Sequence, residues 1–492
     1  MLRKLLKSLQ KVYALPLLLS LGMVCFVYLA SGLFPFGTKT LAWGDMTQQV
    51  LPFMMQFKDI AAGNTGLLFN MANAGGMNFW GVFLFFISSP FTALGLLVPR
   101  SGFYAFANVL VLLKIVLASC AATAFFSSRY AFFKCEKWQA GLLGVLYAFG
   151  GFTLLYYQNV VWLDQLILFP LLMLCFNLLI QKGRVVPFAL LLAVGIFGQF
   201  QIAYTVILAV LLSGGLHILF YVQKAQRRAA ALHLGLAVLL AVGLSAVAWL
   251  PAFFQYQQSA RRGSLIDNLA TTKLLAPVET TLLMLLCTSA VLGGIVFLLF
   301  RRRAQTPMVG YCVTCLCLFT IPLLVDPVNL VWHAGSYQAF PSRYGFIPLF
   351  FALMLVSAAF QNTAPVKEPA KSKPEGIVLA AAGLALYFFF LLHILLFYRQ
   401  QAGVYVYSLW GNMGSLAWAL CCFALGGVLF FLLLAARAKK YLSKRVFAVV
   451  LCCFVAVEGL YNGLLYMCTP ANETESFSMA MDLAEKLPES TG

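Results

Sequence analysis

The chain has 492 residues, of which 62% are hydrophobic, 15% are aromatic and only 10% are charged. Soluble domains carry about 25% charged residues, and the mean hydropathy of +0.91 sets this chain far apart from them. Apolar stretches of roughly 20 residues, long enough to cross a bilayer, recur almost from end to end. The composition therefore excludes a soluble enzyme, a disordered chain and a disulfide-stabilised secreted domain.

The net charge of +18 does not indicate nucleic-acid binding. The Lys and Arg residues lie in short loops between apolar stretches, as in the cytoplasmic loops of membrane proteins. Most of the 13 cysteines lie inside apolar stretches, where we interpret them as small buried hydrophobic side chains. The cluster Cys312, Cys315 and Cys317 has no partnering pair of histidines, so we predict no metal site there.

Thirteen stretches are predicted to span the membrane as helices, which makes the chain an all-α polytopic membrane protein. Their approximate ranges are 13–35, 103–126, 140–157, 161–181, 185–200, 202–223, 230–252, 279–300, 308–325, 343–361, 377–398, 414–435 and 446–467. The apolar stretch 79–98 is interrupted by Ser88, Ser89 and Pro90. We predict an external re-entrant or interfacial hairpin for it instead of a span.

With this assignment, 23 of the 33 Lys and Arg residues fall in cytoplasmic segments and nine fall in external ones. The positive-inside rule then places the N-terminus in the cytoplasm and the C-terminus outside. The predicted organisation is a membrane domain over 1–467 and an external tail over 468–492. A long first external loop, 37–102, carries the interfacial or re-entrant helices.

The first external loop contains the acidic residue Asp45 near its start. Asp45 stands where a helix N-cap is expected, because Gln48 follows three residues later as in a capping box. Apolar residues recur with helical spacing from Val50 to Ile60, which indicates an amphipathic helix in the membrane interface. Asp45 is thus a plain cap, or a carboxylate that takes a proton from a substrate hydroxyl or holds a divalent cation.

A second acidic residue, Asp164, lies a few residues into the span predicted for 161–181. The neighbouring Tyr156, Tyr157 and Trp162 are typical of the aromatic belt at a membrane–water interface. An ionisable side chain below that interface is costly unless it faces a cavity or a partner. We therefore predict Asp164 as a catalytic residue and Trp162 as a supporting one.

Arg343 opens a predicted span at the external face, where the topology disfavours positive charge. A guanidinium is always charged and binds phosphate through two hydrogen bonds. We therefore predict that Arg343 binds the phosphate of a donor substrate. Snorkelling towards lipid head groups is the alternative. His333 is a candidate phosphate ligand or proton carrier beside it. Arg262, next to Arg261 in an external loop, either captures an anionic substrate or is solvated.

Three further ionisable residues complete the candidates. Glu458 lies in the last predicted span, and we expect it to pair with an Arg or Tyr or to serve the site directly. Lys114 lies within the span 103–126 and is expected to neutralise one of the acids. Asp59 in the first loop is a candidate supporting residue of the site. The alternative is that it simply pairs with Lys58 or is solvated.

Several short motifs follow one another along the chain. They are Gly44-Asp45, Gly75-Gly76-Met77-Asn78-Phe79, Tyr147-Ala148-Phe149-Gly150-Gly151-Phe152, Trp162-Leu163-Asp164, Trp332-His333, Phe340-Pro341-Ser342-Arg343-Tyr344 and Glu458 with Asn462. In order and spacing they resemble the YfhO family of bacterial polytopic membrane proteins, which belong with the GT-C glycosyltransferases. The resemblance runs over nearly the whole chain and adds Asn78 as a supporting residue.

The resemblance implies a GT-C-like fold and a transferase in the bacterial cytoplasmic membrane, with its site facing outside. The donor would be a polyprenyl-phosphate monosaccharide, and the acceptor a cell-envelope polymer such as lipoteichoic or wall teichoic acid. GT-C enzymes place an acidic residue in the first external loop, which Asp45 matches, and Arg343 matches the outer arginine of the family. We expect Asp45 to act as general base in an inverting reaction.

No cofactor is expected with certainty, and a divalent cation at Asp45 stays an open alternative. Membrane lipids are the expected surroundings, and no nucleic acid is expected as a partner. A transporter or flippase of lipid-linked sugars is the main rival class, because Asp164, Glu458 and Lys114 would then line a pathway. A non-catalytic envelope assembly factor that binds lipid-linked intermediates is a third class.

Overall fold

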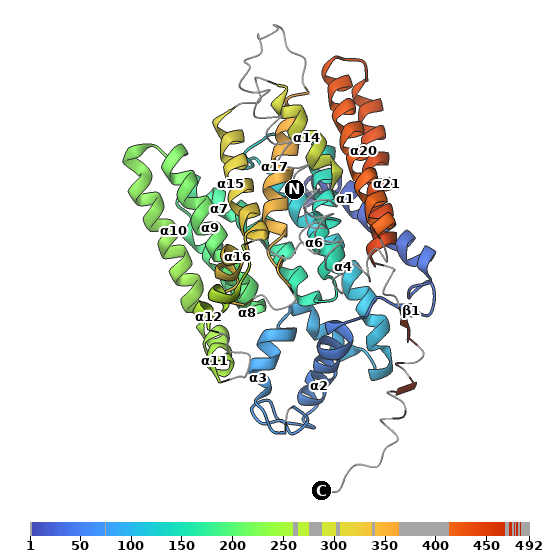
Figure 1. The fold of residues 1–492 in the computed structure, drawn as a ribbon, viewed down its shortest axis with the longest axis vertical. Coiled ribbons are helices and arrows are strands. Elements are labelled where there is room, and N and C mark those ends of the chain that lie inside the picture. Colours follow the sequence, from blue (N-terminus) through green and yellow to red (C-terminus); the bar gives the residue numbers. More distant parts are fainter. Residues whose placement is uncertain are drawn as a thin grey trace.

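The computed structural model describes residues 2–73, 75–258, 264–274, 288–301, 306–336, 340–363, 413–467, 472–474, 477, 479–480 and 483. The described part of the chain is almost entirely helical, and long helices run roughly side by side along the vertical axis of Figure 1.

The first half of the chain contains α1 (Leu2–Ser31), η1 (Met46–Val50), α2 (Leu51–Ala61), α3 (Phe79–Val82), η2 (Phe83–Ile87), η3 (Pro90–Leu97), η4 (Arg100–Gly102), α4 (Phe103–Phe126), α5 (Lys137–Ala148), α6 (Gly151–Tyr156), η5 (Val160–Trp162), α7 (Leu163–Lys182), α8 (Val185–Gly198), α9 (Phe200–Tyr221) and α10 (Lys224–Leu244). The second half contains α11 (Ala246–Gln257), α12 (Leu265–Thr271), α14 (Ser289–Leu299), α15 (Pro307–Leu324), α16 (Asp326–Trp332), α17 (Phe346–Gln361), α20 (Met413–Ala438) and α21 (Lys444–Met467).

Nine helices among the described residues are long and apolar enough to cross a membrane, and α8, α14 and α17 are shorter apolar helices. The predicted all-α polytopic fold is confirmed, whereas the predicted number of 13 spans is not. The predicted span 377–398 lies outside the described residues. Two other predicted spans are each divided into two helices, 140–157 near Gly150 and 230–252 at Ser245.

The apolar stretch 79–98 forms two helices, Phe79–Ile87 and Pro90–Leu97, which are bent by 105° at the expected break. Such a bend is the geometry of a broken span or of a re-entrant loop. The sequence predicted the re-entrant form. The Ser88 hydroxyl donates to the carbonyl oxygen of Gly198 at 2.6 Å. The amide of Gln199 donates to the carbonyl oxygen of Phe85 at 2.8 Å. These two bonds tie the bend to the junction between α8 and α9.

The centre of the packed core is α17, in which every residue from Phe346 to Phe360 is buried. It lies between α14 and α15 in Figure 1 and also contacts α5 and α7. A helix that is apolar on all sides buries all of its faces against other helices. The rings of Phe125, Tyr147 and Phe169 meet Phe350 of α17 edge to face.

Two helix tips that carry basic residues lie at the same end of the molecule. The tip between α20 and α21, with Lys439 and Lys440, lies at the upper end of Figure 1, as does the tip between α9 and α10 with Arg227 and Arg228. The first loop, with α2 and α3, lies at the lower end. The predicted topology assigns the upper end to the cytoplasm and the end with the first loop to the outside.

A two-stranded antiparallel pairing joins the beginning of the first loop to the region after the last helix. Strand β1 (Lys39–Thr40) pairs with β2 (Asn472–Glu473), and the Thr474 amide donates to the Thr38 carbonyl oxygen at 2.9 Å. The ring of Phe477 stacks on Tyr104 of α4, with the ring centres 3.9 Å apart. Part of the predicted tail is therefore held against the first loop.

The assignment of the two ends predicts a result for protease accessibility. A protease site inserted after the exposed Asn64 should be cut in intact spheroplasts, because the first loop is external in the predicted topology. The same site inserted after Lys440 should be cut only after lysis. Cleavage after Lys440 in intact spheroplasts would contradict the topology.

Candidate functional site

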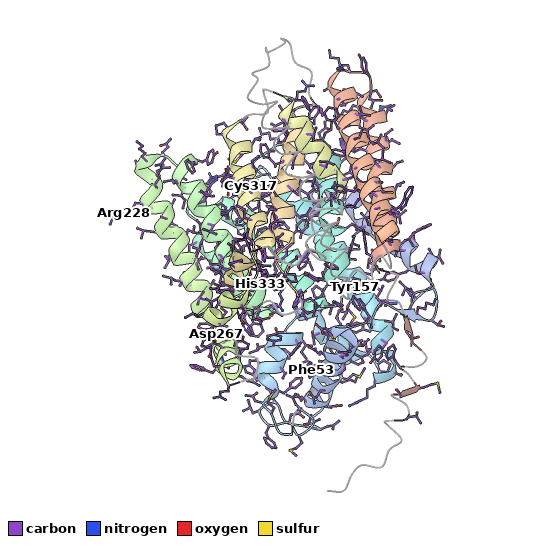
Figure 2. All side chains as sticks on the ribbon, viewed as in Figure 1. Phe53, Tyr157, Arg228, Asp267, Cys317 and His333 are labelled. Atoms are coloured by element: carbon purple, nitrogen blue, oxygen red, sulfur yellow. The ribbon has the colours of Figure 1, made fainter. Side chains whose placement is uncertain are left out.

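One cavity of about 1140 Å³ lies where the first loop meets α11 and the segment before α17. It brings together four of the residues predicted from the sequence. They are Asp45, Asn78, Trp162 and Arg343. Phe53 of α2 also lines this cavity, and Figure 2 places it in the lower part of the molecule. The predicted general base and the predicted phosphate ligand therefore share one hollow of the protein.

The position of Asp45 is set by α4. The amide of Asn108, fully buried in α4, donates to the carbonyl oxygens of Phe34 and Lys39 at 3.1 Å each. Its oxygen accepts from the Leu41 amide at 2.8 Å. Gly44 then turns the chain with a φ of +52°, and a Cβ atom there would come within 2.5 Å of the Gln158 side-chain oxygen. A glycine is required at this step because it alone combines the left-handed φ with the close approach.

The predicted capping role of Asp45 is wrong. Asp45 precedes η1, but its side chain makes no cap hydrogen bond. The physical reason is its backbone, which already has the helical angles φ −59° and ψ −27°, whereas capping residues normally have extended angles. The Gln49 amide instead donates to Oδ1 of Asp45 at 3.3 Å, from one turn further along. The carboxylate is thus directed by a side chain and lies in the wall of the cavity.

Arg343 lies in a short segment that buried polar groups hold in place. The Ser342 amide donates to the Tyr156 hydroxyl at 3.2 Å, and the Asn329 amide donates to the Pro341 carbonyl oxygen at 3.0 Å. The guanidinium itself donates to the Gln201 side-chain oxygen at 3.2 Å. This arrangement fixes the origin of the side chain and directs its charge towards the cavity.

Two aromatic rings hold the Arg343 guanidinium. Its central carbon is 5.2 Å from the ring centre of Trp162 and 5.5 Å from that of Phe340. These two rings meet edge to face at 5.2 Å. Cation–π contacts of this kind are worth about 0.5–2 kcal/mol. Trp162 therefore lines the cavity in contact with the predicted phosphate ligand.

Asn78 joins the first loop to α11. Its side-chain oxygen caps α3 by accepting from the Trp80 amide at 2.7 Å. Its backbone carbonyl accepts from the Gln255 amide of α11 at 3.2 Å. A Cβ atom on Gly81 would come within 1.8 Å of the Gln255 oxygen, so α3 and α11 meet here without space for a side chain. This contact closes one wall of the cavity.

His333 is neutral and does not line the cavity. It lies at the end of α16, near the middle of Figure 2, where its Nδ1 is 2.9 Å from the Asn329 carbonyl oxygen. Burial of the ring, and then the charge of nearby Arg343, lower the pKa of His333 to about 3. Since a neutral imidazole attracts a phosphate only weakly, the geometry gives no support to its predicted part as a phosphate ligand.

Asp164 also lies outside the cavity wall. Its Oδ1 is 2.7 Å from the Lys114 ammonium, and the side chains of Asp164 and Lys114 are only 6% and 1% exposed. The expectation that Lys114 neutralises one of the acids is confirmed. This pairing leaves Asp164 no contact with the cavity through which to act as the predicted catalytic group.

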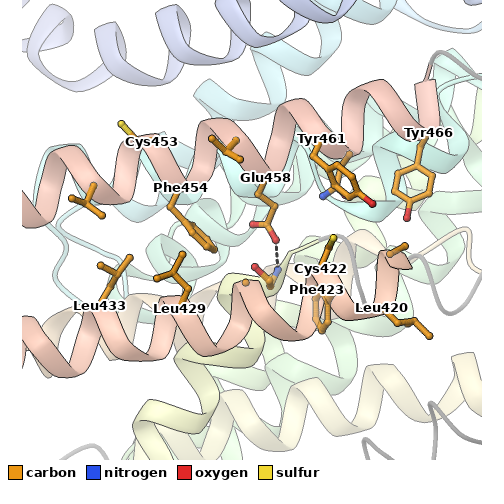
Figure 3. A pocket seen from close by; sticks show the side chains of 16 residues that line it. Leu420, Cys422, Phe423, Leu429, Leu433, Cys453, Phe454, Glu458, Tyr461 and Tyr466 are labelled. Atoms are coloured by element: carbon orange, nitrogen blue, oxygen red, sulfur yellow. Dashed lines mark hydrogen bonds between the residues drawn. The ribbon is translucent and has the colours of Figure 1, made fainter. Parts of the chain in front are cut away.

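Two further predicted residues, Asp59 and Glu458, do not line the cavity. Asp59 pairs with Arg100, not with Lys58. Glu458 accepts from the Ser289 amide at 2.6 Å, not from an Arg or Tyr, and lines a separate cavity of about 510 Å³ between α20 and α21 (Figure 3). The Glu458 carboxylate thereby caps the start of α14, where a negative charge is favourable. Arg262 lies outside the described residues.

Neutral amide side chains form much of the polar wall, and most were not among the residues predicted from the sequence. They include Gln49, Asn73, Asn159, Gln201, Gln255 and Gln258. Gln201 lies two residues after Gln199, whose φ of −162° separates α8 from α9. Polar residues at a break between two apolar stretches were the signal that would have found it.

Among the described residues, no group of three or more His, Cys, Asp or Glu side chains is arranged to hold a metal ion. Asp45 and Arg343 are the charged side chains among the described residues that line the cavity. The arrangement offers one carboxylate to accept a proton, one guanidinium to bind an anion and several amides to hold neutral hydroxyl groups.

The fold is similar to the crystal structure of ArnT from Cupriavidus metallidurans bound to undecaprenyl phosphate, with a TM-score of 0.50 and 13% sequence identity. The match covers 96% of this chain and 81% of that one. At this identity the likeness concerns the fold alone.

The chain belongs to the YfhO family. Residues 16–485 match the family model described as bacterial membrane protein YfhO. The resemblance found in the sequence motifs is thereby confirmed over nearly the whole chain. No curated protein matches the chain.

The lowered pKa of His333 predicts how stability depends on pH. Its folded pKa of about 3 lies below the usual 6.5, so the unfolded chain binds more protons and stability falls as the pH drops below about 6.5. At pH 5 the loss is at most about 2 kcal/mol. Thermal unfolding in detergent should therefore shift less between pH 7.5 and pH 5 in His333→Gln than in the wild type. Equal shifts would contradict the burial of a neutral imidazole.

Proposed function

We propose that this protein transfers a monosaccharide from a polyprenyl-phosphate donor to a cell-envelope polymer, such as a teichoic or lipoteichoic acid, on the extracytoplasmic face of the bacterial membrane. The observation that carries the proposal is the shared cavity of Asp45 and Arg343. A carboxylate and a guanidinium in one hollow are the two groups that such a transfer requires. They are a base for the acceptor hydroxyl and a cation for the leaving phosphate.

The donor phosphate binds to Arg343 in this proposal. Trp162 and Phe340 hold the guanidinium through cation–π contacts, and a guanidinium binds phosphate oxygens through charge-assisted hydrogen bonds. The likeness in fold to ArnT, whose structure contains undecaprenyl phosphate, supports a lipid phosphate as the class of donor.

The donor's isoprenoid tail lies along α11 in the proposed complex. Phe254 and Ala252 of this helix line the cavity, and Val247, Phe253 and Phe254 expose 64%, 44% and 59% of their surface. An exposed apolar helix face that leads into the cavity offers a lipid chain a route from the hydrocarbon layer. The chain stays in apolar surroundings along this route, so it is never exposed to water.

Asp45 acts as the general base. The acceptor hydroxyl attacks the anomeric carbon as its proton passes to the Asp45 carboxylate, and the bond between that carbon and the phosphate oxygen breaks. The polyprenyl phosphate leaves with the electron pair, and Arg343 stabilises the charge that develops on it. A single displacement from the face opposite the phosphate inverts the anomeric configuration. Gln49 donates to Asp45 Oδ1 and so orients the carboxylate.

Replacement of the base tests the proposal most directly. Asp45→Asn keeps the shape of the side chain and removes its proton affinity, so kcat for sugar transfer should fall about 10²–10⁴-fold. The assay uses purified protein in proteoliposomes with a panel of polyprenyl-phosphate sugars and teichoic acid acceptors. Binding of undecaprenyl phosphate should stay within about twofold of the wild type.

Asp267→Asn is the matched control, because Asp267 is an exposed carboxylate of α12 and does not line the cavity (Figure 2). It should transfer sugar at the wild-type rate. Wild-type transfer by Asp45→Asn would exclude Asp45 as the base. Movement of the labelled donor across the bilayer without any transfer by the wild type would favour a flippase instead.

Replacement of the guanidinium tests the donor site. Arg343→Gln should weaken binding of undecaprenyl phosphate about 10–100-fold, because it removes charge-assisted hydrogen bonds worth about 1.5–3 kcal/mol. Arg343→Lys keeps the charge but not the bidentate geometry, so its affinity for undecaprenyl phosphate should lie between those of the wild type and Arg343→Gln. Arg228→Gln, an exposed arginine at the opposite end of the molecule, is the control. Unchanged affinity in Arg343→Gln would remove Arg343 from the donor site.

A further inference from the structure

Lys114 is the most deeply buried cation among the described residues, with 1% of its surface exposed. An ammonium group has three N–H donors, and Lys114 has three acceptors. They are Asp164 Oδ1 at 2.7 Å, the Val160 carbonyl oxygen at 2.9 Å and the Ser89 hydroxyl oxygen at 3.1 Å. The ring of Phe91 lies 5.1 Å away. The ammonium is therefore held inside the protein by one ion pair and two hydrogen bonds.

Two of the acceptors, Ser89 and Val160, belong to segments that each contribute side chains to the cavity wall. Ser89 lies at the 105° bend after η2, and η2 contributes Phe85 and Phe86 to the cavity. Val160 begins η5, which contributes Trp162. Lys114, on α4, does not line the cavity itself. It joins the two segments through its hydrogen bonds to Ser89 and Val160.

The short helix η5 connects the residue that Lys114 contacts, Val160, to the proposed donor site. Val160 and Trp162 are the two ends of η5, and the Trp162 ring is one of the two surfaces on which the Arg343 guanidinium rests. A shift of η5 would move that ring. The orientation of Arg343 therefore depends on the bond between the ammonium and the Val160 carbonyl oxygen.

Stability alone does not account for a charged pair at this place. A buried ion pair can be replaced by apolar side chains of similar size at little cost, or with a gain, and charges within a membrane protein are expensive. The ammonium, however, can bind three acceptors from different segments at once, which no apolar side chain can do. The geometry of the bend and of η5 is what the pair maintains.

We propose that Lys114 and Asp164 are positioning residues that hold the bend at Ser89 and η5 in register, and thereby keep Trp162 and Arg343 arranged for an anionic lipid head group. The inference rests on the proposed function, because it concerns the same donor site. It assigns Asp164 the task of keeping Lys114 charged and oriented, rather than a chemical step.

The test combines an apolar double variant with the removal of the tryptophan. Lys114→Met/Asp164→Leu avoids an unpaired buried charge, and its affinity for undecaprenyl phosphate in detergent should fall about 10-fold. Trp162→Ala should lower the affinity by a similar factor. Because Lys114 acts through Trp162, all three substitutions together should weaken binding by about 10–20-fold rather than by the product of the two effects.

A smaller change covers the case in which the double variant does not fold. Ser89→Ala removes one acceptor and should weaken binding about 2–3-fold, whereas Ser89→Thr keeps the hydroxyl and should restore it. Asn177→Leu is the structural control. Asn177 lies further along α7, and its side-chain amide donates a hydrogen bond to the Tyr130 carbonyl oxygen, which the substitution removes. It should lower the unfolding temperature and leave the affinity unchanged.

Three results would overturn the inference. They are wild-type affinity in the folded double variant, multiplicative losses in the combined variant, and equal affinities of Ser89→Ala and Ser89→Thr. A wild-type protein that does not bind undecaprenyl phosphate would overturn the proposed function, and this inference with it. If the double variant loses affinity for undecaprenyl phosphate and the wild type binds it, the result supports both the proposed function and this inference.

Discussion

The structure depends on one constraint, which is that a backbone group exposed by a break in a membrane helix must find a partner inside the protein. Three breaks meet near the cavity, and side chains satisfy each of them. Ser88 bonds the Gly198 carbonyl, Gln199 bonds the Phe85 carbonyl, and Lys114 bonds the Val160 carbonyl. The irregular segments are thus joined to one another, and each break supports the next.

The same constraint explains where the polar residues are. Regular apolar helices around α17 leave no space for a hydrophilic hollow, whereas the breaks bring backbone and amide groups together at one end of the molecule. The cavity with Asp45 and Arg343 opens among these segments. A site that handles both a lipid tail and a sugar needs this combination, because the tail requires apolar helix faces and the sugar requires hydrogen-bonding groups.

The sequence predicted the helical membrane fold well, because hydropathy over some 20 residues is a strong signal. It also predicted Asp45, Arg343, Trp162 and Asn78, which do share a cavity. The sequence predicted that Lys114 neutralises an acid but not that the acid is Asp164, and it did not predict that Ser289 meets Glu458, since these contacts form only after distant helices pack. The capping role expected for Asp45 failed because the backbone there is already helical.

The pairing of β1 with β2 has a consequence for the synthesis of the protein. The bond between Thr38 and Thr474 joins residues that are 436 positions apart in the sequence. A nascent chain emerges from the ribosome N-terminus first, so the loop that carries Asp45 gains this anchor only after the last helix has been inserted. The site is completed late, and an unfinished chain in the translocon lacks the support that holds its first loop.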